Sequence, residues 1–429
     1  MASDELALSR IGRPYRERGL RVLAWLVWLA LFGVQLSPAN HFWTAWARMA
    51  LLGSLMVSAL SWADLYAALA QRDWRRFLER LFLGVGAAWW LWSLLELIWP
   101  ELRLGHGVFL AGAGMGLAAM MGVHALAGCG RTRRNLALVG ECGLWRELEA
   151  ELEQHPEWGW RIAAHVAWPA PQHWAEMQAE LARQDIRHLV LAQAAPEPVW
   201  RKLQAAGARL VRAQEFFEQV TGKAADPGAG GRPIRRRSKR VRDAVLAALA
   251  LAGLAPLLAL IAFGIWLDSG RPVLFRQLRL GEGGCAFVLY KFRTMCPAAT
   301  TGEAGWRPAD LNDRRCTRLG KWLRRYRLDE LPQLWNILGG EMSWVGPRPF
   351  AVEQERLLAE QLPGYARRWQ VPPGATGWAQ IHRGYCRSLE DNREKLAYDL
   401  FYIQHGSWRL DLLILLRTPR VLLLSRGGQ

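Results

Sequence analysis

The apolar segment at residues 244–267, AVLAALALAGLAPLLALIAFGIWL, decides the membrane topology expected for this chain. It is long enough to cross a bilayer, for which a helix needs about 20 residues. Both flanks are basic, however, since RRRSKRVR precedes the segment at 235–242 and Arg271, Arg276 and Arg279 follow it. Basic flanks mark the cytoplasmic side, and Pro256 near the midpoint bends a helix. We therefore favour a re-entrant helix over about 241–268 with its break at Pro256, and an ordinary kinked span is the alternative.

Four further apolar segments precede this one, at about residues 22–36, 43–70, 81–99 and 108–127. Each approaches the length of a membrane-spanning helix. Arginines gather before the first segment, between the second and third, and after the fourth. By the positive-inside rule these flanks are cytoplasmic. The sequence therefore predicts a multi-pass membrane protein whose residues 1–130 form a four-helix transmembrane bundle with both ends in the cytoplasm.

The composition agrees with a membrane protein and also indicates anionic partners. Hydrophobic residues make up 51% of the 429 residues, the chain contains 24 Trp, and the net charge is +17. From residue 231 onward about 32 Lys and Arg stand against about 17 Asp and Glu, which favours lipid headgroups and phosphorylated substrates over nucleic acid as partners. The six cysteines are scattered without a CxxC pair, as expected for reduced thiols. No cleavable signal peptide is expected.

Between residues 131 and 224 short β-type runs alternate with helix-type runs. Strands are predicted at 136–139, 161–166 and 188–191, and helices at 145–153 and 174–183. This alternation predicts a small Rossmann-like βαβ domain on the cytoplasmic side. Its first loop, Gly140-Glu-Cys-Gly143, lacks one glycine of a dinucleotide fingerprint and carries a carboxylate that would oppose a phosphate. Cofactor binding and a scaffold or regulatory role both stay open, and the Gly- and Pro-rich residues 225–238 are predicted to form a linker.

The last part of the chain, residues 239–429, is predicted to be a mainly α-helical catalytic domain. Its motifs combine Arg or Lys with Gly and carboxylates, which is typical of a phosphate-handling site: FRQ at 275–277, RLG at 279–281, KFRTM at 291–295, NDR at 312–314, LDELPQL at 328–334, VGPRP at 345–349 and PGATGWAQ at 373–380.

The adjacent carboxylates of Asp329 and Glu330 are the candidate catalytic pair. On a helix they would point about 100° apart, so one can attack phosphorus while the other holds a metal. Mg²⁺ suits this arrangement because it takes oxygen ligands from carboxylates and phosphates together. Pro332 would end the helix and turn the pair toward a shallow site. The competing interpretation is a solvated pair next to Arg324, Arg325 or Arg327, and only the surrounding motifs favour the catalytic one.

Phosphate ligands are expected among the basic residues of these motifs. Lys291, Arg293, Arg314 and Arg348 can balance a diphosphate, whereas Arg324 and Arg325 are expected to be surface cations near lipid headgroups. In the last motif Gly377 suits a tight loop that approaches a ligand, and with Gln380 it marks a nucleotide-binding or structural loop. Trp378 has two equally supported interpretations, as a wall of the nucleotide site or as an anchor in the membrane interface.

In this order, and after an apolar segment with a central proline, the motifs resemble those of the bacterial sugar transferases, the monotopic polyprenyl-phosphate sugar-1-phosphate transferases. The resemblance covers about residues 239–424. The four-helix bundle followed by a βαβ domain resembles the larger members, which start O-antigen, capsule or exopolysaccharide assembly with galactose- or glucose-1-phosphate.

The resemblance implies a ping-pong reaction at the cytoplasmic face of the bacterial inner membrane. Asp329 would attack the β-phosphorus of a UDP-sugar, release UMP and hold the sugar phosphate until undecaprenyl phosphate takes it, while Glu330 would bind Mg²⁺. Lys291, Arg293, Arg314 and Arg348 match motif positions and would serve the phosphates. The implied partners are the UDP-sugar, undecaprenyl phosphate and membrane lipids, and self-association into a homodimer is expected.

Three positions depart from the family pattern. Arg327 stands where many members have Ser or Thr, Cys285 stands where Lys is common, and residues 382–384 read HRG where an NGR order is frequent. These departures bear on sugar specificity and on the phosphate ligands. Two other functions stay open, a catalytically silent membrane scaffold for polysaccharide assembly and a glycosyltransferase that moves only the sugar and releases UDP. A scaffold would have no physical reason to keep Asp329, Glu330, Lys291 and Arg348 together.

Overall fold

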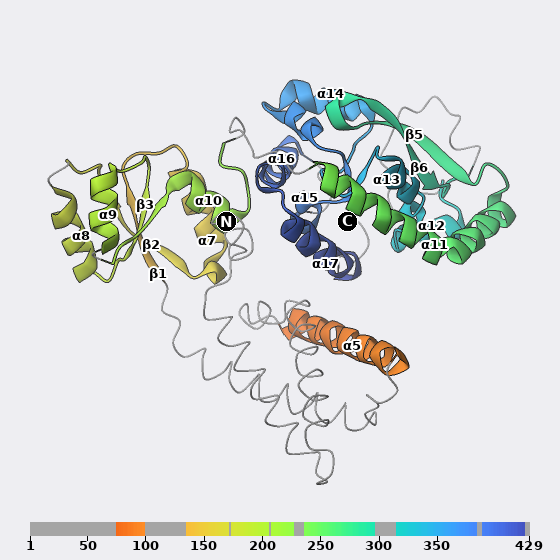
Figure 1. Ribbon diagram of the computed structural model, residues 1–429, viewed down its shortest axis with the longest axis horizontal. Coiled ribbons are helices and arrows are strands. Elements are labelled where there is room, and N and C mark those ends of the chain that lie inside the picture. Colours follow the sequence, from red (N-terminus) through yellow and green to blue (C-terminus); the bar gives the residue numbers. More distant parts are fainter. Residues whose placement is uncertain are drawn as a thin grey trace, which may run out of the picture. The chain divides into compact units, whose positions relative to one another are not determined.

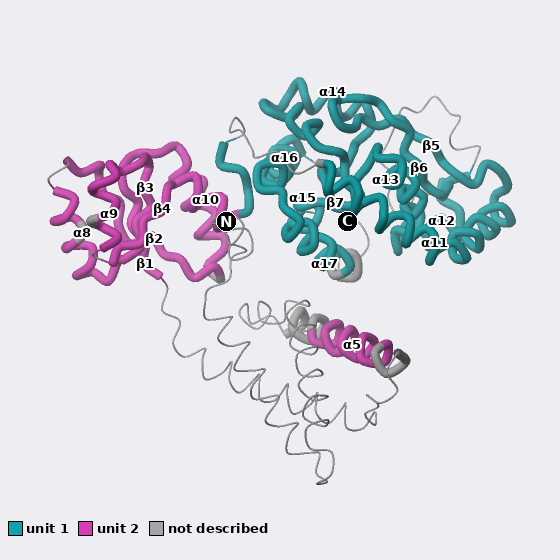
Figure 2. The backbone as a smooth tube through the Cα atoms, in the orientation of Figure 1, with its two compact units in different colours: residues 1–8, 222–429 teal, residues 9–221 magenta. Residues whose placement is uncertain are grey.

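The computed structural model describes residues 74–98, 134–170, 173–205, 207–226, 236–296, 315–383 and 388–424. The described residues fall into two compact units, one within residues 9–221 and the other from residue 222 onward (Figure 2). Helix α5 (Trp74–Ile98) covers the third of the four predicted N-terminal spans, and its residues 81–94 are apolar. The other three segments lie outside the described residues. The four-helix bundle therefore stays a prediction.

The α/β domain contains one parallel sheet with strand order β2-β1-β3-β4. Its elements are β1 (Arg134–Val139), α7 (Trp145–Gln154), η2 (Pro156–Trp158), β2 (Trp160–Val166), α8 (Trp174–Arg183), β3 (His188–Leu191), α9 (Glu197–Ala205), β4 (Arg209–Arg212) and α10 (Ala213–Thr221). Figure 1 shows α8 and α9 on one face of the sheet and α7 and α10 on the other. Residues 136–139 of β1 are at most 1% exposed, as expected for a strand covered on both faces. The predicted alternation of strands and helices is confirmed, and β4, α9 and α10 extend it.

Two tryptophans pack against the glycine that follows β1. In an open parallel sheet, ligands bind at the carboxyl ends of the strands where the strand order reverses, which here is between β1 and β3. Gly140 follows β1, and a Cβ atom on Gly140 would lie 2.9 Å from the Trp168 ring and 3.1 Å from the Cβ atom of Ala192, which follows β3. Trp145 also donates its indole N–H to the Gly140 carbonyl at 2.8 Å. This packing fixes the start of the loop, and both predicted roles of the domain stay open.

The second unit combines helices with two small sheets. Its elements are α11 (Arg236–Ser269), β5 (Leu274–Leu280), η4 (Glu282–Gly284), β6 (Ala286–Phe292), α12 (Arg318–Arg325), η6 (Leu328–Glu330), α13 (Gln333–Gly339), β7 (Ser343–Val345), α14 (Val352–Gln361), η7 (Tyr365–Gln370), β8 (Gly374–Thr376), α15 (Trp378–His382), α16 (Leu389–His405) and α17 (Trp408–Leu424). Helices predominate, but the antiparallel pair β5-β6 and the parallel pair β7-β8 make the unit α/β rather than purely helical. Residues 222–226 also belong to this unit, since the Ala224 amide donates to the Ala397 carbonyl at 3.0 Å.

Helix α11 is the one described helix that is long and apolar enough to cross a bilayer. Pro256 lies inside it, and Figure 1 shows α11 changing direction partway along. A proline removes the backbone donor to the carbonyl four residues earlier and crowds that turn, which bends a helix. One side of α11 exposes large apolar residues, among them Leu249, Leu260, Phe263 and Leu267.

Both halves of α11 pack against the same unit. Before Pro256, Ala247 joins a core cluster with Leu289 and Ile337. After Pro256, Leu258, Ile261 and Ile265 join a second cluster with Phe292 and Leu323. The amino-terminal end of the helix is also held by polar contacts, because Lys239 Nζ lies 2.9 Å from Asp411 Oδ2 and Ser343 Oγ donates to Asp243 Oδ2 at 2.6 Å. The helix therefore lies along the unit rather than leading away from it.

Candidate active site

The two candidate carboxylates lie on η6, a short 3-10 turn between α12 and α13. Helix α12 begins after Thr317, whose hydroxyl accepts from the Gly320 amide at 2.9 Å. It cannot continue past Arg327, which adopts a left-handed φ of 54°. Pro332 then caps α13 rather than ending the helix that carries the pair. The structure thus replaces the predicted helix by a tighter turn, on which neighbouring side chains are about 120° apart, so Asp329 and Glu330 still point in different directions.

Three basic side chains surround the carboxylate of Glu330. Lys291 on β6 donates to Glu330 Oε1 at 2.9 Å, and Arg348 donates to both carboxylate oxygens, with Nη1 3.2 Å from Oε2. Arg327 Nη1 lies 3.8 Å from Oε1. Burial raises the pKa of Glu330, but the charges of Arg348 and Lys291 outweigh burial and hold this pKa well below its ordinary value. Glu330 is therefore ionised, and it holds two of the predicted phosphate ligands in one place.

Asp329 has a different environment from its neighbour. Its side chain is 9% exposed, and among the described residues no side chain donates a hydrogen bond to its carboxylate. Burial, reinforced by the negative charge of Glu330, raises the pKa of Asp329 to about 6, against the attraction of Lys291, Arg324 and Arg327. Two adjacent carboxylates with pKa values driven apart are typical of a division of labour, and of the two Asp329 is the one that accepts no side-chain hydrogen bond from a described residue.

The acidic side chains of the described residues fit a Mg²⁺ ion held largely by a substrate. No described group of three or more Asp, Glu, His or Cys side chains could hold the ion by itself. Mg²⁺ is commonly held by one or two carboxylates together with substrate phosphates. Both oxygens of Glu330 already accept from Arg348, so Glu330 would have to exchange a cationic partner for the ion. Asp329 offers oxygens without such donors, and the ligand role predicted for Glu330 stays a prediction.

One predicted phosphate ligand, Arg293, does not stand in this cluster. Arg293 is 5% exposed and points to the carboxyl end of α11, where Nη2 donates to the Ser269 carbonyl at 2.6 Å, to Ser269 Oγ at 2.8 Å and to the Gly270 carbonyl at 2.8 Å. A guanidinium there satisfies carbonyls that the helix leaves without partners, so in this structure Arg293 secures α11. Arg314 lies outside the described residues.

The PGATGWAQ loop forms part of the core next to the site. A Cβ atom on Gly377 would overlap the Gly346 carbonyl oxygen, so the glycine allows the loop to approach the turn that precedes Arg348. Trp378 is 2% exposed, donates its indole N–H to the Gly222 carbonyl at 2.8 Å and stacks on Phe401. This burial differs from both predicted roles. A wall of a nucleotide site and an anchor in the membrane interface would each expose the side chain. Gln380 donates to the Ala375 carbonyl at 3.3 Å and keeps its side-chain oxygen buried without a partner.

Two arginines lie near the site although the sequence did not predict them to be part of it. Arg324 was expected at the lipid surface, but it is half-buried, donates from Nε to Thr294 Oγ1 at 2.8 Å and lowers the pKa of Asp329. Burial, together with the charge of Arg348, lowers the pKa of Arg279 to about 10. Arg279 also donates to the Pro349 carbonyl at 3.3 Å. The RLG motif was the sequence signal for Arg279, whereas Arg324 carried no signal that separated it from Arg325.

Comparison with known proteins adds independent information about this half of the chain. The model of a protein family described as bacterial sugar transferase matches residues 234–425, which include the cluster around Glu330. A UDP-glucose:undecaprenyl-phosphate glucose-1-phosphate transferase of Xanthomonas campestris pv. campestris is 44% identical over 188 residues, which are 43% of this chain and 39% of that protein.

Two further relatives broaden the comparison. A UDP-N-acetylgalactosamine-undecaprenyl-phosphate N-acetylgalactosaminephosphotransferase of Aeromonas hydrophila is 40% identical over 201 residues, 46% of each chain. A UDP-glucose:undecaprenyl-phosphate glucose-1-phosphate transferase of Caulobacter vibrioides is 46% identical over 187 residues, 43% of this chain and 69% of that protein. The matches thus span less than half of the first two relatives and about two thirds of the third.

Proposed function

The chain belongs to the bacterial sugar transferase family, and from this premise we propose that it transfers a hexose-1-phosphate from a UDP-sugar to undecaprenyl phosphate. Galactose and glucose are the sugars proposed, and the step would be the first membrane reaction of O-antigen, capsule or exopolysaccharide synthesis. The observation that carries the proposal is the pair Asp329 and Glu330, in which one carboxylate is available while the other holds Lys291 and Arg348.

The proposed reaction has two displacements at one phosphorus atom. An oxygen of Asp329 attacks the β-phosphorus, the bond from that phosphorus to the bridging oxygen breaks, and UMP leaves with the oxygen. The sugar phosphoryl group then rests on Asp329 as an acyl phosphate. A phosphate oxygen of undecaprenyl phosphate attacks the same phosphorus, which frees the Asp329 carboxylate and forms a polyprenyl diphosphate sugar. Lys291 and Arg348 stand beside the pair to balance the phosphoryl oxygens in both steps.

We include Mg²⁺ in the proposal as a cofactor that Glu330 would hold together with the diphosphate of the UDP-sugar. When bound it would neutralise charge on the diphosphate and so favour departure of UMP. The protein contributes the rest: burial raises the pKa of Asp329 to about 6, and Glu330 keeps the two phosphate ligands in place.

The decisive experiment uses the full-length protein with undecaprenyl phosphate and a panel of UDP-sugars, and it measures the nucleotide released. UMP release that depends on Mg²⁺ and on one UDP-sugar supports the proposal. Release of UDP would mean that only the sugar moves, and no release with any donor would support the scaffold alternative.

We further propose that α11 enters the membrane and returns to the cytoplasmic side, with the turn near Pro256. The support is that both halves of α11 and both of its ends contact the same unit. Single cysteines at Arg237 and Asp268, two exposed positions at opposite ends of the helix, are placed in a chain whose native cysteines are replaced by serine. Both are expected to react with an impermeant maleimide in inverted membrane vesicles. Reaction of only one before permeabilisation would show that α11 spans the bilayer.

The raised pKa of Asp329 predicts how the first half-reaction depends on pH. The attacking carboxylate must be ionised, and with a pKa of about 6 its ionised fraction falls about tenfold per pH unit below that value. UMP release without lipid acceptor is therefore expected to be constant above about pH 7 and to decline below about pH 6. The acceptor is omitted because a phosphate monoester itself titrates near pH 6. A rate that stays constant down to pH 5 would contradict the assignment.

A further inference from the structure

The turn that carries Arg348 has its backbone held by hydrogen-bond donors from elsewhere in the unit. This turn, residues 346–350, reads Gly-Pro-Arg-Pro-Phe and follows β7. The Pro347 carbonyl accepts from the Gly374 amide at 2.9 Å, and the Pro349 carbonyl accepts from Arg279 at 3.3 Å. The Arg348 carbonyl accepts from Arg368 Nη2 at 2.7 Å. Three successive carbonyls are therefore each fixed by a donor outside the turn.

Arg368 is the centre of a buried ionic network behind this turn. Its side chain is 3% exposed, and its guanidinium donates from Nε to Asp399 Oδ2 at 2.9 Å and from Nη1 to Glu355 Oε1 at 3.1 Å. Glu355 in turn accepts from the Phe350 amide at 2.9 Å and from the Trp369 indole at 3.1 Å. Arg368 thus binds the turn directly through its Nη2 group and indirectly through Glu355.

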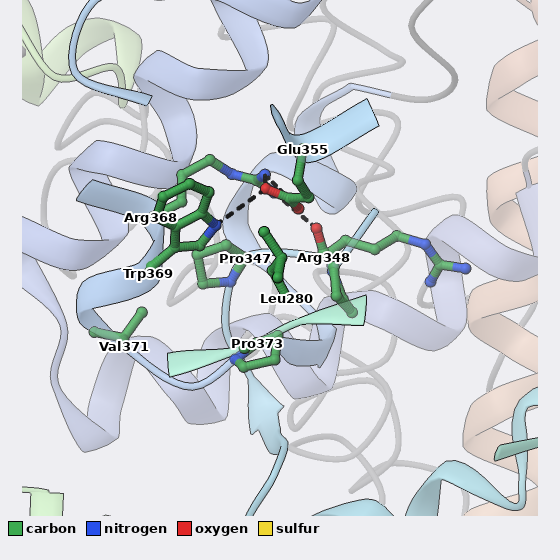
Figure 3. Close-up of a pocket in the computed structure, with 10 residues that line it drawn as sticks. Leu280, Pro347, Arg348, Glu355, Arg368, Trp369, Val371 and Pro373 are labelled. Atoms are coloured by element: carbon green, nitrogen blue, oxygen red, sulfur yellow. Dashed lines mark hydrogen bonds and ion pairs between the residues drawn. The ribbon is translucent and has the colours of Figure 1, made fainter. Parts of the chain in front are cut away.

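The network and the side chain of Arg348 lie on opposite sides of the turn. Figure 3 shows Arg368, Glu355 and Trp369 gathered beside the backbone of Arg348, while the Arg348 side chain extends away from them. That side chain ends at Glu330. A guanidinium fork presents its donors in a fixed plane, so a shift of the backbone that carries it moves both of its contacts together.

We propose that Arg368 is a positioning residue of the transferase reaction, which sets the place of the Arg348 guanidinium beside Glu330 without touching substrate itself. This inference rests on the proposed function, because it assigns Arg348 to the phosphates of the UDP-sugar. The physical reason is that Arg368 joins one carbonyl of the turn to two buried carboxylates, Glu355 and Asp399. A lysine at 368 keeps the charge but cannot make these contacts in one plane.

The test is a double-mutant cycle on kcat/KM for UMP release, with Arg368→Lys, Arg348→Ala and the double variant. Arg368→Lys alone is expected to lower kcat/KM about tenfold or more, because small misplacements of a phosphate ligand are costly. In the Arg348→Ala background the same change is expected to alter kcat/KM less than about twofold, since its effect passes through Arg348. Arg356→Lys, an exposed neighbour on α14, is the matched control and should leave kcat/KM unchanged.

An equal loss from Arg368→Lys in both backgrounds would overturn the proposal, because a purely structural role does not depend on Arg348. If Arg368→Lys does not fold, Glu355→Gln takes its place in the cycle with the same expectations, since it weakens the hold of Glu355 on Arg368. If the wild-type protein releases no UMP, the proposed function and the role of Arg368 in the reaction both fail, and amide hydrogen exchange then tests only the hold of Arg368 on the turn. Faster exchange at residues 350–351 in Arg368→Lys than in Arg356→Lys supports it, and equal exchange overturns it.

Discussion

Asp329→Asn is expected to lower the rate of UMP release by at least about 10³-fold, the scale seen when a covalent nucleophile is removed. The amide keeps the shape of the side chain but cannot form an acyl phosphate. The fold should tolerate the change, because burial and the charge of Glu330 already disfavour the ionised form of Asp329 and raise its pKa to about 6. Denatured protein from a reaction with a radiolabelled UDP-sugar should carry label in the wild type and none in the variant.

The matched control for this substitution is Asp185→Asn in the α/β domain, where the carboxylate is 86% exposed. It should retain both turnover and label. Turnover within about tenfold of wild type in Asp329→Asn would remove Asp329 as the nucleophile. Loss of turnover with persistent label would instead place the covalent bond on another side chain.

Glu330→Gln is expected to lower kcat about 10²-fold, because Lys291 and Arg348 lose the carboxylate that holds their side chains in position beside Asp329. It should also destabilise the protein. Removing one partner of a fully buried ion pair costs about 3–5 kcal/mol. The side chains here are 16–24% exposed, so we expect a loss near the lower end, about 3 kcal/mol. The midpoint of thermal unfolding and the steady-state kinetics measure the two effects.

The Mg²⁺ dependence of Glu330→Gln separates two roles for this carboxylate. If Glu330 is a ligand of the ion, as predicted from the sequence, the Mg²⁺ concentration for half-maximal activity should rise. If Glu330 only holds the two cations, that concentration should stay constant while kcat falls. Glu353→Gln, on the exposed side of α14, is the control for the loss of one carboxylate. Wild-type activity in Glu330→Gln would contradict both roles.

Local patterns predicted the parts of this protein that depend on neighbouring residues. The bounds predicted for α8 and β3, 174–183 and 188–191, are those of the structure, because hydrophobic period is a property of a short stretch. The long apolar helix around Pro256 and the phosphate-handling motifs of the transferase domain were likewise predicted from the sequence. A bilayer-length helix and phosphate chemistry each require particular residue types. The β5-β6 hairpin and the 3-10 turn at Asp329 were missed, since tertiary contacts fix both.

The motifs predicted that basic residues surround Asp329 and Glu330, but which of them do so depends on the fold. Lys291 and Arg348 reach Glu330 across separations of 39 and 18 residues. Arg293, two residues from Lys291, instead secures the end of α11. Arginines at 293, 348 and 368 carry the same charge and differ only in what the fold brings to them. A motif fixes the kind of side chain, whereas packing of distant segments fixes its partner, because an ion pair depends on distance in space.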